Sequence, residues 1–373
     1  MPGLLGQTRP KLSPGAHIHK RKNMNFTRVR LAALAIALLC HSVVQAADGF
    51  TGAGSSAAYP IYKLWAEQLN RDGTIALKYD PAGSSAGLQR VRAKQVDFGA
   101  TDVAPKSEQL AKDNLVLFPT AITGVVPVVN LPKTDKALVL DGATLAGIFL
   151  GDIERWDAPE IRALNPGLSL PAKPIVRIVR ADSSGTTYNF ADYLAKVSPA
   201  WKQKMGVATG LKWPAAFTSV NGSKGVAEAV RATAGAIGYV DYNYVLEYKL
   251  SAANLKNAEG ATVEPNAATF QEALFQGPWM HGGDFTQTLT NLPGKRSWPI
   301  TMGTFVVMQR VADKPEQTAR VTRFFTEAFM RGDDLAKQAN FVRLPATIQG
   351  KAFRALAEIV DSKGAPIAVG ALR

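Results

Sequence analysis

Cysteine and histidine are scarce among the 373 residues of this sequence. The single cysteine, Cys40, and three of the four histidines lie within residues 1–46, and only His281 lies beyond them. We predict below that the chain is cleaved after residue 46, which leaves no cysteine. A chain without cysteine cannot form disulfides or thiolate metal sites and has no cysteine nucleophile. One histidine cannot form a multi-histidine metal site. We therefore expect no metal and no cofactor.

Internal repeats, low-complexity tracts and runs of basic residues are also missing beyond residue 46. The formal charge of +13 suggests a nucleic-acid partner, but seven of the 43 basic residues and no acidic residue fall within residues 1–46. Residues 47–373 carry a formal charge of +6, and their basic residues are scattered along the sequence. We therefore expect no nucleic-acid partner.

The N-terminal segment 24–46 has the pattern of a secretory signal peptide. Arg28 and Arg30 precede a short apolar core, residues 31–39, and residues 44–46 end in the small-residue pattern of a cleavage site. The core is too short for an ordinary membrane-spanning helix, although a buried N-terminal helix remains an alternative. Residues 1–23 form an extension that matches no targeting pattern and is left out of the fold prediction. We expect an exported, periplasmic protein.

Short β-rich runs alternate with helical patterns beyond residue 46, which predicts an α/β fold. Pro127 suggests that one strand lies at an edge or a crossover. Asp141 is the predicted N-cap of a helix that ends at Gly151. The predicted strands are 96–100, 125–129, 175–179, 236–240 and 305–308. One further predicted helix carries Ile61, Leu64, Trp65 and Leu69 on one face. Two more helices are predicted at 315–331 and 345–361.

Three turns rich in small residues stand before predicted helices. They are residues 52–56, 83–87 and 180–187. Each places hydroxyls and unpaired backbone N–H groups at a helix N-terminus, where free donors and the helix dipole favour an anion. One such turn is more simply explained as helix capping. Three turns, one of them with Arg180 as a fixed positive charge, favour an oxyanion site.

Asp102 ends the predicted strand at 96–100 and places a carboxylate near the expected anion. An ionised carboxylate only accepts hydrogen bonds, so it can bind a protonated phosphate oxygen. Sulfate carries no proton at neutral pH and would be repelled, which gives discrimination between the two anions. Taken alone, Asp102 is more simply explained as a turn or cap residue.

These motifs together resemble the family of periplasmic phosphate-binding proteins that serve the high-affinity Pst ABC transporter. The resemblance runs from Thr51 to the last predicted helix. Single motifs have little specificity, but their combination is highly specific. Residues 51–54, 83–85, 96–102, 180–182, 235–240 and 298–301 carry it.

The resemblance implies a type II periplasmic-binding-protein fold, with two α/β lobes joined by two crossover segments and phosphate buried between them. Lobe I would comprise residues 47–126 and 300–373, and lobe II residues 127–299. It implies a monomer, without enzymatic activity, that hands phosphate to the membrane permease and ATPase subunits of a transporter. The phosphate ligands would be Ser56, the backbone N–H of Ala57, Ser84, Asp102, Arg180, Ser184, the backbone N–H of Gly185, and Thr186, with Asp182 orienting Arg180.

Three positions depart from the family pattern. Ser56 stands in place of a threonine, Ala57 in place of an aromatic residue, and Ser183 in place of a glycine. The hydroxyl and N–H functions survive at the first two positions. These changes bear on affinity more than on the identity of the ligand.

Two other functions compete with phosphate transport, and an exported phosphate binder with a role in secretion or surface adhesion is a third alternative. Residues 83–87 fit the G-x-S-x-G motif of a secreted serine hydrolase, which would use Ser85 as nucleophile and His281 as base. The residues before this motif are a poor buried strand, and His281 lies in a predicted loop, so both residues are more simply structural. The same three turns would also suit a receptor for another oxyanion, such as sulfate, phosphonate or arsenate. Asp102 argues for a protonated ligand.

Overall fold

The computed structural model describes residues 49–69, 76–133, 135–282 and 285–367. The predicted signal peptide, 24–46, and the extension before it, 1–23, lie outside these residues. Within the described ranges, no helix combines the length and the apolar character needed to cross a membrane.

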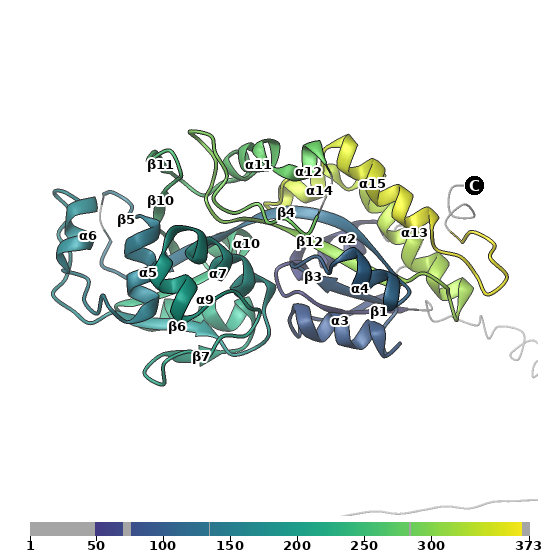
Figure 1. Ribbon diagram of the computed structural model, residues 1–373, viewed down its shortest axis with the longest axis horizontal. Coiled ribbons are helices and arrows are strands. Elements are labelled where there is room, and N and C mark those ends of the chain that lie inside the picture. Colours follow the sequence, from purple (N-terminus) through teal and green to yellow (C-terminus); the bar gives the residue numbers. More distant parts are fainter. Residues whose placement is uncertain (1–48, 70–75, 134, 283–284, 368–373) are drawn as a thin grey trace, which may run out of the picture. The chain divides into compact units, whose positions relative to one another are not determined.

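Strands and helices alternate along most of the chain, which confirms the predicted α/β class (Figure 1). The strands are β1 (Phe50–Gly54), β2 (Leu77–Asp80), β3 (Phe98–Thr101), β4 (Leu115–Val129), β5 (Val139–Leu140), β6 (Val176–Arg180), β7 (Thr218–Val220), β8 (Ala236–Asp241), β9 (Ser251–Ala252), β10 (Asn254–Lys256), β11 (Thr262–Val263) and β12 (Thr301–Gln309). The helices are α2 (Tyr59–Leu69), α3 (Ser84–Arg92), α4 (Ser107–Lys112), α5 (Gly142–Leu150), α6 (Pro159–Leu164), α7 (Gly185–Val197), α8 (Pro199–Lys204), α9 (Gly222–Ala232), α10 (Tyr242–Glu247), α11 (Ala267–Gln276), α12 (Pro278–His281), α13 (Pro315–Arg331), α14 (Asp333–Gln338) and α15 (Ala346–Ala357).

The main sheet has the strand order β2-β1-β3-β12-β4-β8-β6-β7, with β9 also pairing with β4. β1 is parallel to β2 and β3, and β6 is parallel to β7 and β8. β12 and β4 are antiparallel to their neighbours in the centre of the sheet. The carboxyl ends of β1 and β3 in one half, and of β6 and β8 in the other, are followed by the segments that form the site below.

β4 joins the two halves of the sheet. Its first part, up to Gly124, pairs with β12, and from Val125 onward it pairs with β8. Nearly every residue of β4 is buried, as expected for a strand covered on both faces. Pro127 is not at an edge, because it lies opposite Tyr239 of β8 and its carbonyl accepts from the N–H of Ala253. The edge interpretation is therefore wrong, and the crossover interpretation is confirmed.

Aromatic side chains form much of the core in each half. Phe98 packs edge-on against Phe325 of α13, with ring centroids 5.2 Å apart. In the other half, Phe190 of α7 stacks on Tyr239 of β8 at 4.2 Å. Such pairs contribute about 0.5–1.5 kcal/mol each beyond the burial of their surface. They fix α13 and α7 against the sheet.

Most predicted elements are present. The strand predicted at 96–100 begins later, at Phe98, and the last predicted helix ends earlier, at Ala357. Asp141 caps α5 by accepting from the N–H of Thr144, and Gly151 ends that helix in the left-handed conformation. The first predicted turn is wrong in part, because residues 52–54 belong to β1 and only the segment after Gly54 turns.

Candidate anion-binding site

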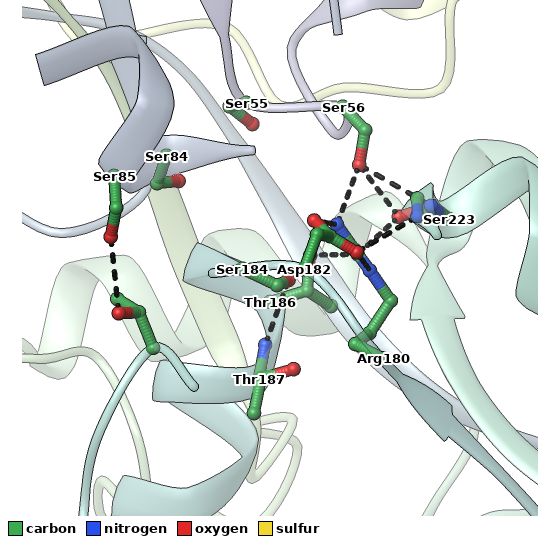
Figure 2. A network of polar contacts seen from close by, with 12 residues as sticks. Ser55, Ser56, Ser84, Ser85, Arg180, Asp182, Ser184, Thr186, Thr187 and Ser223 are labelled. Carbon is green, nitrogen blue, oxygen red and sulfur yellow. Dashed lines mark hydrogen bonds and ion pairs between the residues drawn. The ribbon is translucent and has the colours of Figure 1, made fainter. Parts of the chain in front are cut away.

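The three predicted turns meet at one place in the structure. The segment after β1 brings Ser55 and Ser56, the start of α3 brings Ser84, and the segment between β6 and α7 brings Arg180 and its neighbours (Figure 2). Gly83 is the N-cap of α3 and has φ of 97°, a conformation that favours glycine. Figure 2 shows the hydroxyl of Ser56 pointing toward Arg180 and Ser223.

Asp102 directly follows β3 and is 4% exposed. Its carboxylate accepts from Ser55 Oγ at 2.6 Å and from Ser84 Oγ at 3.3 Å. Burial, and then the charge of the nearby Asp241, raise the pKa of Asp102 to about 7, against the lowering effect of Ser55 and Arg180. Asp102 is therefore a group that can accept or donate a hydrogen bond near neutral pH.

Arg180, at the end of β6, is held by a bidentate ion pair. Its Nε lies 2.8 Å from Asp182 Oδ1, and its Nη2 lies 2.6 Å from Asp182 Oδ2. Asp182 Oδ1 also accepts from the N–H of Gly222 at 2.9 Å. Burial alone would raise the pKa of the Asp182 carboxyl, but its hydrogen bonds to Arg180 and the charge of that residue lower it. The predicted orienting role of Asp182 fits this geometry.

The remaining donors of Arg180 point at hydroxyl groups from both halves of the sheet. Nη2 donates to Ser56 Oγ at 3.2 Å, and Nη1 donates to Ser223 Oγ at 3.0 Å. Nη1 also contacts Thr186 Oγ1 at 3.5 Å. A fixed cation among hydroxyl groups is an arrangement that suits a tetrahedral oxyanion.

The N-terminus of α7 completes the site. Ser184 is its N-cap and accepts from the N–H of Thr187 at 3.2 Å. Gly185 lies so close to the other half that an added Cβ would stand 2.5 Å from Ser84 Oγ and 2.5 Å from the Cβ of Asp102. Asn189 Nδ2 donates to the carbonyls of both Asp102 and Gly185 at 2.9 Å. The positive end of α7 therefore faces the Asp102 carboxylate.

Comparisons with known proteins show the family to which the chain belongs. A family model described as a PBP superfamily domain matches residues 42–319. The phosphate-binding protein PstS of Haemophilus influenzae is 42% identical over 303 residues, which cover 81% of this chain and 90% of that protein. PstS of Pasteurella multocida is 40% identical over 320 residues, 86% of this chain and 93% of that protein. The solved structure of a phosphate-binding protein from Stenotrophomonas maltophilia has a TM-score of 0.64 at 20% identity and covers 87% of this chain and 97% of that one.

The chain belongs to the PstS family. Its fold is the two-lobed type II binding-protein fold that the family resemblance implied.

In this PstS family member, most of the predicted ligand residues share two hydrogen-bonded clusters. One cluster contains Ser56, Arg180, Asp182 and Thr186. The other joins Asp102 to Ser84, and Gly185 packs against both of these residues. The two others lie beside these clusters: Ala57 is fully buried next to Ser56, and Ser184 caps α7.

Sequence reasoning missed four polar residues of this site. Asp241 is the last residue of β8 and Asp102 directly follows β3, and this shared position at the end of a buried strand was the available signal. Ser223 follows Asn221 and Gly222 at the start of α9, which is a fourth turn of small residues before a helix. The third is Ser55, described above, and the fourth is Tyr244, whose hydroxyl donates to the carbonyl of Ser56 at 3.1 Å. No sequence pattern marked Tyr244.

The structure does not favour the serine hydrolase. Ser85 lies in the first turn of α3, and its hydroxyl shares a hydrogen bond of 3.1 Å with Thr209. His281 is an exposed residue at the end of the short helix α12. Among the described residues, no hydrogen bond joins the two. The strand before the motif, β2, is at the edge of the sheet and only half-buried, unlike the strand that precedes a nucleophile elbow.

We expect the stability of the protein, stripped of bound anion, to fall as the pH rises from about 5 to about 8. The unfolded chain loses the Asp102 proton near pH 4, whereas the folded chain keeps it until its raised pKa of about 7. The folded state therefore binds more protons in this window, and its free energy of unfolding decreases by about 3 kcal/mol across it. Asp241, whose pKa burial also raises, acts in the same direction.

Urea unfolding of the parent and of Asp102→Asn at both pH values measures this effect. The variant should lose a large part of the pH dependence and keep the part due to Asp241. If the free energy of unfolding changes equally with pH in the two proteins, Asp102 ionises at its ordinary pKa in the folded chain.

Proposed function

We propose that this protein binds inorganic phosphate with high affinity outside the inner membrane and delivers it to the permease of an ABC transporter. The main support is the Arg180 cluster, in which a buried guanidinium from one half of the sheet donates to Ser56 from the other half. An oxyanion held there would be bound from both sides. The curated relatives described above are named phosphate-binding proteins.

Phosphate would be bound through side chains and backbone groups of both lobes. We place lobe I at residues 47–126 and 300–373 and lobe II at residues 127–299. The proposed ligands are Ser56, Ala57 (N–H), Ser84, Asp102, Arg180, Ser184, Gly185 (N–H) and Thr186, with Asp182 orienting Arg180. Phosphate would enter an open cleft, contact one lobe, and then favour the closed form through contacts with the other lobe.

Residues 24–46 would direct export to the periplasm and be removed. The closed, monomeric protein would dock on a membrane permease, and an ATPase subunit would drive release. Binding breaks no covalent bond, so we propose no enzymatic activity.

Calorimetric titration of the mature protein, stripped of bound anion, tests the function directly. We expect tight one-to-one binding of phosphate and no signal from sulfate at about pH 8. Equal binding of the two anions would favour a general oxyanion receptor instead. If neither anion binds, the transport function is wrong.

Asp102→Asn should lower the ratio of phosphate affinity to sulfate affinity by about tenfold or more, because an amide can donate to sulfate where a carboxylate repels it. In the parent, the same ratio should rise from about pH 6 to about pH 8, since Asp102 is protonated below its pKa of about 7 and can then donate. The variant should show a smaller rise than the parent. Titrations of both proteins with both anions at these two pH values measure the effect. A variant that rejects sulfate as strongly as the parent would contradict the role given to Asp102.

A further inference from the structure

Asp241 is a buried carboxylate of the site to which the proposal above gives no role. It is the last residue of β8 and is 0% exposed. Oδ1 accepts from Thr186 Oγ1 at 3.2 Å, and Oδ2 accepts from Ser223 Oγ at 2.7 Å. Both hydroxyls also accept from Nη1 of Arg180. Asp241 therefore accepts hydrogen bonds from the hydroxyls of Thr186 and Ser223, which both lie next to the Arg180 guanidinium.

The charges around Asp241 do not balance. The charged or titratable groups facing it are Arg180 on β6, Asp102 after β3 and Tyr244 on α10. Arg180 is already paired with Asp182 through two hydrogen bonds. One cation thus serves three carboxylates, and an added phosphate makes the excess of negative charge larger. A buried carboxylate without a full counter-charge is a favourable place to bind a proton.

The hydroxyl of Thr186 has one proton, and this limits what it can do. While that proton points to Asp241, it cannot also point to a phosphate oxygen. If Thr186 donates to phosphate, Asp241 loses one of its two hydroxyl donors. Asp241 also gains a negatively charged neighbour, the bound phosphate. Both changes favour the protonated form of the carboxylate. A proton bound at Asp241 Oδ1 can then be donated to Thr186 Oγ1, which restores the same hydrogen bond with its direction reversed.

We propose that Asp241 is a positioning residue that takes up one proton from solvent when phosphate binds, and so turns the Thr186 hydroxyl toward the anion. The proton comes from water or buffer, and no covalent bond other than that O–H bond forms. The inference rests on the proposed function, because it assumes that phosphate binds at the Arg180 cluster. The raised pKa of Asp241, due first to burial, agrees with it.

Proton uptake on binding can be measured by titrating phosphate in two buffers that differ in ionisation enthalpy, between about pH 6 and about pH 9. We expect Asp241→Asn to take up fewer protons than the parent, by at most about one per phosphate at the pH of largest difference. Because Asp102 also titrates, the comparison is repeated with Asp102→Asn as the starting protein. The decrease in proton uptake caused by Asp241→Asn should persist when Asp102→Asn is the starting protein.

Two variants at Thr186 keep the test decisive even if Asp241→Asn does not fold. Thr186→Val leaves the carboxylate in place but removes the hydroxyl that changes direction, and it should lose the same proton uptake. Thr186→Ser keeps the hydroxyl and should keep the uptake. A purely structural role for Asp241 predicts no difference in proton uptake between the valine and serine variants.

The outcomes separate the two proposals. If the parent binds no phosphate, the proposed function is wrong. If the parent binds phosphate but neither Asp241→Asn nor Thr186→Val changes the proton uptake, the proposed function stands and the inference about Asp241 is overturned.

Discussion

Replacing Arg180 by alanine is expected to weaken phosphate binding by one to two orders of magnitude. The guanidinium is 3% exposed and is the only cation within the two hydrogen-bonded clusters of the described site. Hydrogen bonds to a charged group contribute about 1.5–3 kcal/mol each, and about 1.4 kcal/mol corresponds to a tenfold change in affinity. The substitution also leaves Asp182 without its partner, and that charge would repel the anion.

Arg180→Lys distinguishes the effect of the positive charge on phosphate binding from the effect of the guanidinium's hydrogen-bond geometry. A lysine keeps the positive charge but cannot make the paired contacts to Asp182 while also donating to Ser56 and Ser223. We therefore expect an affinity between those of the parent and the alanine variant. Calorimetry measures both, and circular dichroism checks that each variant is folded. An alanine variant that binds phosphate as tightly as the parent would place the site elsewhere in the molecule.

Local patterns predicted the elements of the fold well, since strand and helix signals depend on neighbouring residues. The helix 315–331 is found within the same bounds, and the cap at Asp141 is present as expected. Pro127 shows the limit of such reasoning. A proline is restricted at a strand centre only where a neighbour needs its N–H. Pro127 lies within the part of β4 that pairs with β8, shortly after β4 changes partners between Gly124 and Val125.

The candidate site depends on contacts that are distant in the sequence. Ser56 lies 124 residues from Arg180 and 167 residues from Ser223, and the strand order alone brings them together. The three turns and Asp102 were found because each carries a local signal. The pairing of Asp241 with Thr186 was not found, because it requires β8 to lie beside β6, and no local pattern specifies that register.

Gly185 lies close to the other half of the site, and Gly185→Ala is expected to lower phosphate affinity by about 10- to 100-fold. The added Cβ would lie 2.5 Å from Ser84 Oγ and 2.7 Å from Asp102 Oδ2. Overpacking of this kind costs about 1–3 kcal/mol. Because Ser84 and Asp102 belong to the other half of the sheet, the clash can be relieved by separating the two halves. The cost therefore falls on the closed, phosphate-binding form.

We expect Gly185→Ala to lose phosphate affinity without losing stability. Alanine is favoured over glycine in a helix by about 1 kcal/mol, so the variant stripped of anion should unfold at the same urea concentration as the parent or a higher one. Gly350→Ala in α15 is the matched control, because its Cβ would meet nothing within 4 Å. It should keep the parent affinity. A Gly185 variant that loses stability as much as affinity would mean that the contact with Ser84 and Asp102 stabilises the folded chain as a whole, and that the halves do not separate around it.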